Sequence, residues 1–224
     1  MPKQWCSKLN EFLYKADANQ IFEAVTYHSL NNTGIEQRLG PSSNISMIPA
    51  EGITAEEYLQ ILDKNSYSAV FDDGAVVIIQ VTFRQNDLYS HRYLYIPCPI
   101  AQEHISMRDA DIPLADWIEM TIDQLDIESI RSSGYLRFDY GREHGESPIE
   151  AHPISHMTFI SGSCRVPVYR PLTIASFFNF VFDNYYRNHR SFWLNYSPFL
   201  SSDRIKETIT PKELTLHHLD WCPD

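Results

Sequence analysis

The most regular pattern in the chain is an alternation of apolar and polar residues within residues 67–96. In its middle, the odd positions of 75–83 are all apolar, whereas the even positions change from valine and isoleucine to Gln80 and Thr82. Because successive side chains of a strand point to opposite faces, this predicts a strand buried on one face and half covered on the other. The Asp-Asp-Gly turn at 72–74 supplies the positive φ values of a tight hairpin, so we expect antiparallel pairing.

Residues 88–96 form the third strand of this group. His91 shares one face with three tyrosines, whereas Arg92 shares the other face with two leucines and an isoleucine. Alternation alone does not choose which of these faces points inward. His91, Gln80 and Thr82 are kept as candidate binding residues of the sheet.

Three more short strands are predicted within residues 134–169. One face of them is apolar and carries Leu136, Phe138, Tyr140, Met157, Phe159, Cys164, Val166 and Val168. The opposite face carries Arg137, Asp139, His156 and Arg165. The Phe-rich segment that follows has apolar residues at helical spacing, which predicts a helix that covers the apolar face.

The N-terminal part of the chain is less regular. Helical spacing of apolar residues predicts a helix over 5–15 and one or two further helical turns over 21–25. Residues 30–52 are polar and contain Gly and Pro, so we expect a long loop without regular structure. Thr54 and Glu57 form a capping box, in which each side chain accepts a hydrogen bond from the other residue's backbone amide, so a helix should begin there.

The complete pattern predicts an α+β fold with an antiparallel sheet of five or six strands and helices packed mainly on one face. One of these predicted helices is amphipathic and begins after Pro113. With 43% hydrophobic residues in 224, we expect one ordered domain. It comprises a helical N-terminal part with a long loop (1–66), a sheet-and-helix core (67–190) and a tail (191–224) that the pattern does not place.

Several separated motifs between residues 67 and 186 are characteristic. In chain order they are H-R-Y-L-Y-I-P-C-P, R-F-D-Y, H-P-I-S-H, C-R-V-P-V, P-L-T and F-F-N-F-V-F-D-N-Y-Y. In these motifs the chain resembles an uncharacterised bacterial family known as DUF2290, whereas its two ends resemble it less. The resemblance implies a bacterial, cytoplasmic protein of about this length that accompanies defence or mobile-element genes. It implies no known activity, cofactor or catalytic residue.

The charge of the chain bears on the partners it attracts. The net charge is −11, so long-range attraction to a nucleic-acid backbone is not expected. Residues 103–150 hold twelve acidic residues and four arginines, a local balance of 4 − 12 = −8. This segment is either a solvated surface or a docking surface for a basic partner protein. No membrane partner is expected, because no run of about twenty apolar residues occurs.

The cysteines indicate the redox compartment. Cys6, Cys98, Cys164 and Cys222 are widely separated and form no C-x-x-C pair, as expected for reduced thiols of a cytosolic protein. Met1 is not followed by the apolar core of a signal peptide. We therefore expect a cytoplasmic protein.

Two patterns that resemble metal sites lack the geometry for one. His152 and His156 would lie about 13 Å apart on an extended segment, whereas ligand nitrogens lie about 2 Å from a zinc ion. Asp72-Asp73 before a strand resembles a metal-dependent nuclease hairpin, but the next strand reads Gln-Val-Thr at 80–82, without the carboxylate and lysine of those enzymes. We expect no metal and no cofactor, and keep His152 as a candidate binding residue.

The strongest candidates for chemistry are Arg137, Asp139, His156 and Arg165. Two guanidinium groups can clamp an anion, and a histidine can transfer protons near neutral pH, as metal-independent phosphodiester cleavage requires. Alternatively, Arg137 and Asp139 neutralise each other in a structural network.

Two functions follow from these features. The leading hypothesis is a non-catalytic interaction subunit of a bacterial multi-protein assembly, such as an anti-phage defence system, whose protein partner docks on the acidic 103–150 region. The alternative is a hydrolase or nucleic-acid-processing enzyme that uses the polar face of the sheet. Nucleic acid is expected only through the partner or at this face.

Overall fold

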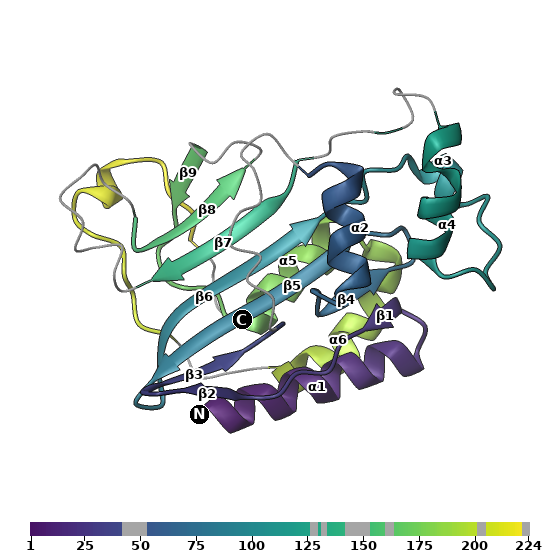
Figure 1. Cartoon of the computed structure of the whole chain (residues 1–224). Coiled ribbons are helices and arrows are strands. Elements are labelled where there is room, and N and C mark those ends of the chain that lie inside the picture. Colours follow the sequence, from purple (N-terminus) through teal and green to yellow (C-terminus); the bar gives the residue numbers. More distant parts are fainter. Residues whose placement is uncertain are drawn as a thin grey trace.

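The computed structural model of the chain describes residues 1–41, 53–125, 130, 134–141, 153–159, 164–200 and 205–220, and Figure 1 shows the arrangement of its elements. The strands are β1 (Phe22–Val25), β2 (Asn31–Thr33), β3 (Glu36–Leu39), β4 (Ala69–Phe71), β5 (Val76–Arg84), β6 (Asp87–Ile96), β7 (Leu136–Gly141), β8 (Ser155–Phe159) and β9 (Cys164–Pro167). The helices are α1 (Pro2–Ala18), α2 (Ala55–Asp63), α3 (Gln102–Ile105), α4 (Leu114–Thr121), α5 (Ile174–Asn184) and α6 (Arg190–Leu200).

All strands belong to one antiparallel sheet with the order β1-β4-β5-β6-β7-β8-β9. The β2–β3 hairpin joins it through β3, which pairs with one end of β5, while β4 pairs with the other end. The predicted α+β class is confirmed. The predicted number of strands was too low, because the described residues form a nine-stranded sheet that includes three short N-terminal strands.

These three strands replace predicted irregular or helical segments. β1 occupies residues 22–25, where helical turns were expected, and β2 and β3 lie within the expected 30–52 loop. All three residues of β2 are polar and exposed, so no apolar alternation marks it, and only backbone pairing with β3 makes it a strand. Gly40 follows β3 with φ +129°, and a Cβ there would lie 2.4 Å from the carbonyl oxygen of Ile79. Residues 42–52 lie outside the described residues.

The predicted hairpins and helix start are present. Thr54 and Glu57 form the expected capping box at the start of α2. Gly74 has φ +78° in the turn between β4 and β5. The turn between β5 and β6 is shorter than residues 84–87, which the predicted strands 75–83 and 88–96 left between them, because Gln85 and Asn86 both adopt positive φ values and the strands extend to Arg84 and Asp87.

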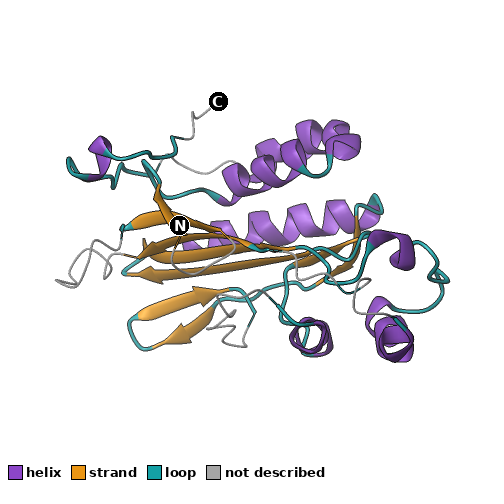
Figure 2. Ribbon diagram, turned by 90° about the horizontal axis from the view of Figure 1, so that it is seen from above, coloured by secondary structure: helices purple, strands orange, loops and turns teal. Residues whose placement is uncertain are grey.

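One face of the sheet packs against α1, α5 and α6, and Figure 2 shows the sheet seen from its edge with helices on both sides. Phe12 of α1 contacts Phe178 of α5 with ring centroids 4.8 Å apart, and Phe71 of β4 stacks on Tyr186 at 3.7 Å. Each buried aromatic ring stabilises the fold by about 1.5–3 kcal/mol. The predicted stripe on α5 is buried apart from Tyr185, which is half exposed.

The unplaced tail also has regular structure. Its first part is α6, which packs against α1 and α5 and places Trp193 in the core. Residues 205–220 then return to the end of β9, where the Leu219 amide donates to the Pro167 carbonyl at 2.9 Å and the Tyr169 amide donates to the Leu219 carbonyl at 2.8 Å. Leu219 therefore lies beside the end of β9, the strand that carries Arg165.

The described helices of the second face, α2 and α4, extend over only part of its length. α2 and α4 pack on the ends of β5 and β6 that carry Val76, Ile78, Leu94 and Ile96. Figure 1 shows α2 in front of this part of the sheet. Shorter helices on this face agree with the expectation that helices pack mainly on the other one.

Candidate functional site

The part of the second face that lies beyond α2 and α4 is polar, and we call it the polar sheet face. Its side chains include Arg38, Gln80, Thr82, Arg92, Arg137, Asp139, His156, Thr158 and Arg165. The register places Gln80, Arg92, Asp139 and His156 opposite one another on the four consecutive strands β5 to β8. Cross-strand neighbours of this kind have Cβ atoms roughly 5 Å apart, so their side chains interact.

Asp139 lies at the centre of this face, and three basic side chains converge on its carboxylate. Arg92 Nε donates to Oδ1 at 2.8 Å, and Arg137 Nε lies 2.6 Å from Oδ2. His156 Nε2 lies 3.5 Å from Oδ2, and its Nδ1 is 3.0 Å from the carbonyl oxygen of Pro153. The structure thus brings together three of the four residues that the sequence suggested for chemistry.

The surroundings of Asp139 keep it ionised. Burial raises the pKa of this carboxyl, since only 5% of the residue is exposed. The polar contact with the His156 ring and the charges of Arg92 and Arg137 outweigh burial and hold the pKa well below its usual range. One negative charge therefore lies between two guanidinium groups at neutral pH.

His156 and Arg165 differ in access to solvent. The side chain of His156 is 0% exposed, and its two ring nitrogens face Asp139 and the carbonyl oxygen of Pro153. Arg165 is exposed on β9, opposite Thr158 and away from Asp139 in the register. Arg165 shares the face but does not join the contacts around Asp139.

The other candidate binding residues divide between the two faces. Gln80 and Thr82 lie on the polar sheet face and are partly exposed. His91 points to the opposite face, among the helices, where its ring stacks on Tyr93 with centroids 4.2 Å apart. Burial lowers the pKa of His91 to about 3, so it is neutral at physiological pH. His152 lies outside the described residues.

The metal-ligating residue types are dispersed. In the described parts of the chain, no group of three His, Cys, Asp or Glu side chains is placed to hold a metal ion. Cys6, Cys98 and Cys164 form no disulfide bond within the described residues, and Cys222 lies outside them. No described helix is long and apolar enough to cross a bilayer.

The family model described as "Uncharacterized conserved protein (DUF2290)" matches residues 19–221. The chain belongs to the DUF2290 family. The match extends beyond the motif-bearing residues 67–186 on both sides, so the short N-terminal strands and the C-terminal segment of this DUF2290 protein belong to the family pattern. No curated protein and no solved structure matches it.

A second polar cluster in this DUF2290 protein was not anticipated. Tyr186 donates to both carboxylate oxygens of Asp73, at 2.8 and 2.9 Å, and its hydroxyl lies 3.2 Å from that of Tyr95. Burial raises the pKa of Asp73, and the backbone amide of Ala75 and Tyr186 partly oppose this by hydrogen bonding. From the sequence, Asp73 was interpreted only as a turn residue. Its partner Tyr186 is 113 positions away, so no local pattern indicates the contact. The cluster fixes the β4–β5 turn to the end of α5.

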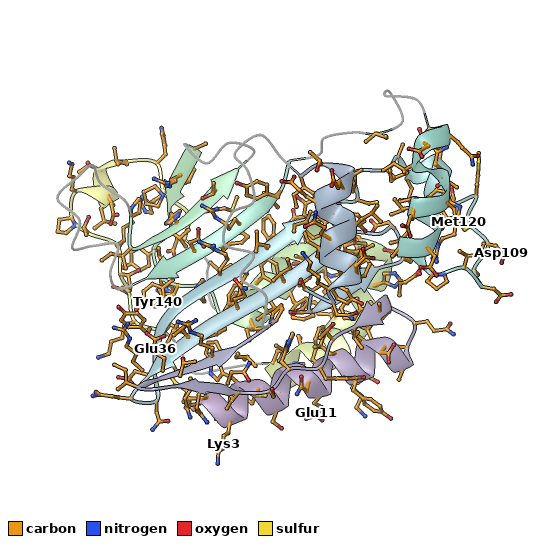
Figure 3. All side chains as sticks on the ribbon, in the orientation of Figure 1. Lys3, Glu11, Glu36, Asp109, Met120 and Tyr140 are labelled. Atoms are coloured by element: carbon orange, nitrogen blue, oxygen red, sulfur yellow. The ribbon has the colours of Figure 1, made fainter. Side chains whose placement is uncertain are left out.

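The acidic region also contains apolar side chains. Residues 102–124 carry six acidic residues and one arginine, a balance of 1 − 6 = −5. Met107 and Met120 are 76% and 65% exposed. Arg108 bonds Glu23 of β1 and the carbonyl of Ile112, so its charge is already engaged. We call residues 102–124 the acidic α3–α4 surface, and Figure 3 shows its residues Asp109 and Met120 at the side of the molecule opposite Tyr140 of β7.

Proposed function

We propose that this DUF2290 protein is a non-catalytic accessory subunit of a bacterial multi-protein assembly, of the kind found in anti-phage defence, and that it docks a basic partner protein on the acidic α3–α4 surface. The observation that carries the proposal is the combination of exposed carboxylates with two exposed methionines on this surface. All six acidic residues, Glu103, Asp109, Asp111, Asp116, Glu119 and Asp123, are exposed.

The chemistry of this surface supports a protein partner. None of Asp111, Asp116, Glu119 and Asp123 forms an ion pair with a cation of the described chain. Methionine is enriched at protein interfaces because its flexible thioether adapts to the surface that covers it. Surrounding carboxylates attract a basic partner and set its orientation.

The polar sheet face offers less support for the alternative, a hydrolase. General acid–base catalysis requires the catalytic group within hydrogen-bond reach of the substrate. His156 is enclosed, and its two ring nitrogens lie by Asp139 and Pro153. The contacts around Asp139 therefore favour a structural or binding role over proton transfer.

Charge reversal tests the proposal. The double variant Asp116→Lys/Glu119→Lys should lose the protein that co-purifies stoichiometrically with the tagged wild-type chain from its native cells. The control, Glu11→Lys/Asp17→Lys, changes the net charge equally on the outer side of α1, where Figure 3 shows Glu11, and should retain the partner. Hydrogen exchange of the complex should slow within 102–124. Retention of the partner by Asp116→Lys/Glu119→Lys, or protection confined to other segments, would refute the proposal.

A further inference from the structure

Thr158 is a fully buried polar residue of the polar sheet face. It lies on β8, opposite Arg137 of β7 and Arg165 of β9. The residue is 0% exposed, and its Oγ1 has no hydrogen-bond partner among the described residues. Buried hydroxyl groups in folded proteins are nearly always hydrogen-bonded. The missing partner of this hydroxyl can therefore be an acceptor atom of a bound ligand.

The two neighbouring arginines have donors that Asp139 does not occupy. Arg92 is 31% exposed and uses Nε for Asp139, so both of its Nη groups remain without a partner in the described chain. Arg137 is 14% exposed, and its Nε forms an ion pair with Asp139 without directing its N–H at the oxygen. Asp139 therefore holds two guanidinium groups side by side while satisfying only part of their hydrogen-bonding capacity.

The charge of this region is opposite to that of the whole chain. Arg92, Arg137 and Arg165 against Asp139 give 3 − 1 = +2, in a chain with a net charge of −11. A phosphomonoester carries about −1.5 to −2 at neutral pH, which matches this excess better than a single carboxylate does. Guanidinium groups recognise phosphate oxygens through paired N–H donors.

We infer that the polar sheet face binds a phosphomonoester group, held by Arg92, Arg137 and Thr158. Arg92 and Arg137 contact the phosphate oxygens, and the Thr158 hydroxyl donates the hydrogen bond that it does not make within the described chain. Asp139 is a positioning residue that orients both guanidinium groups. Arg165, exposed two strands from Arg137, adds positive charge at the rim.

This site goes beyond the proposed docking function and uses a different part of the molecule. Both ring nitrogens of His156 face groups of the protein, Asp139 and the carbonyl oxygen of Pro153, so the site is one that holds the phosphate and does not cleave it. Two kinds of ligand present such a phosphomonoester group, a free mononucleotide and the 5′ end of a nucleic-acid strand. Gln80, opposite Arg92 and partly exposed, lies where it can contact the remainder of either ligand.

Binding measurements with four probes test the inference. Isothermal titration calorimetry with AMP should show saturable binding to the wild-type protein, whereas adenosine should not bind. A single-stranded oligonucleotide with a 5′-phosphate should bind more tightly than the same oligonucleotide with a 5′-hydroxyl. If it also binds more tightly than AMP, the strand end is the source, and if not, the mononucleotide is.

Three variants identify the site. Arg92→Gln should weaken AMP binding by about tenfold or more, because a charge-assisted hydrogen bond is lost. Thr158→Val keeps the shape of the side chain and removes only the hydroxyl, so it should weaken binding by about fivefold while the protein stays folded. Arg38→Gln is the matched control, since Arg38 is an exposed arginine on the same face that already pairs with Glu36, and it should bind AMP as the wild type does.

Several results would overturn the site. One is the absence of saturable AMP binding to the wild-type chain, and another is equal affinity for the phosphorylated and hydroxyl probes. A Thr158→Val protein that is folded and binds normally would show that the hydroxyl plays only a structural part. Equal loss in Arg38→Gln would show general charge attraction. Asp116→Lys/Glu119→Lys should leave AMP binding unchanged, which separates this inference from the proposed docking function.

Discussion

The two halves of the second sheet face share β6 but are held together by different forces. Where α2 and α4 cover it, β5 and β6 present Val76, Ile78, Leu94 and Ile96. Two residues before Leu94 on β6, Arg92 meets the charged group formed by Asp139 and Arg137 of β7 and His156 of β8. The apolar half gains stability in proportion to the area removed from water, whereas the charged half depends on each charge keeping its partner.

The largest expected effect is in the charged half. Asp139→Ala should lower the free energy of unfolding by about 3–5 kcal/mol, because Arg92 and Arg137 then lose their shared counter-ion in a partly buried setting. Urea denaturation of the variant and the wild type would measure this. Asp139→Asn, which keeps the shape and removes the charge, should recover only part of the loss. A loss below about 1 kcal/mol in the alanine variant would indicate that the network is solvated.

A smaller effect is expected in the apolar half. Leu94→Ala should cost about 2–4 kcal/mol, because Leu94 is fully buried and its removal leaves a cavity beneath α2 and α4. The midpoint of urea denaturation should fall with little change in slope. If Leu94→Ala proves more costly than Asp139→Ala, apolar burial and not the charge network dominates this face.

The pH dependence of stability tests two buried histidines, His91 and His28. Burial lowers the pKa of His91 to about 3 and that of His28 to about 4, below the ordinary value near 6.5. Between pH 6.5 and 5 the unfolded chain binds more protons at these residues, so stability falls as pH falls, by about 1.4 kcal/mol per pH unit for each histidine. Denaturation at a series of pH values would give the slope.

In His91→Gln the free energy of unfolding should depend less steeply on pH than in the wild type. The difference between the two slopes is the contribution of His91. His28→Gln should do the same from the other end of the sheet, where His28 Nε2 lies 2.9 Å from Ser68 Oγ. An unchanged slope in His91→Gln would mean that this ring gains a proton in the folded protein.

The smallest effect is expected for an exposed ion pair. Arg38→Gln removes the contact between Arg38 and Glu36, in which the Arg38 side chain is 55% exposed. Exposed pairs contribute about 0–1 kcal/mol, and Glu36 retains Arg84 at 2.6 Å. The thermal midpoint should therefore stay close to that of the wild type. A large fall would show that charge placement matters over the whole polar sheet face and not only around Asp139.

Alternation and turn residues were sufficient to predict the strands whose side chains face a core. The three strands within 67–96 and the three within 134–169 were predicted correctly, as was the capping box at Thr54. Alternation also placed Arg137, Asp139 and His156 on one face. It could not identify Arg92 as their partner, because the alternation of β6 fits either face, and only pairing with β5 and β7 decides between them.

Local sequence determined the elements of this protein wherever a strand or helix carries its own apolar pattern, since that pattern reflects which side chains leave water. Tertiary structure alone decided what depends on contacts between distant segments. It made strands of the polar residues at 31–33, joined Tyr186 to Asp73, and placed Arg92 and Arg137 on one carboxylate. Backbone pairing and charge pairing carry no periodic signal along the chain, so these features arise only when the strands are brought together.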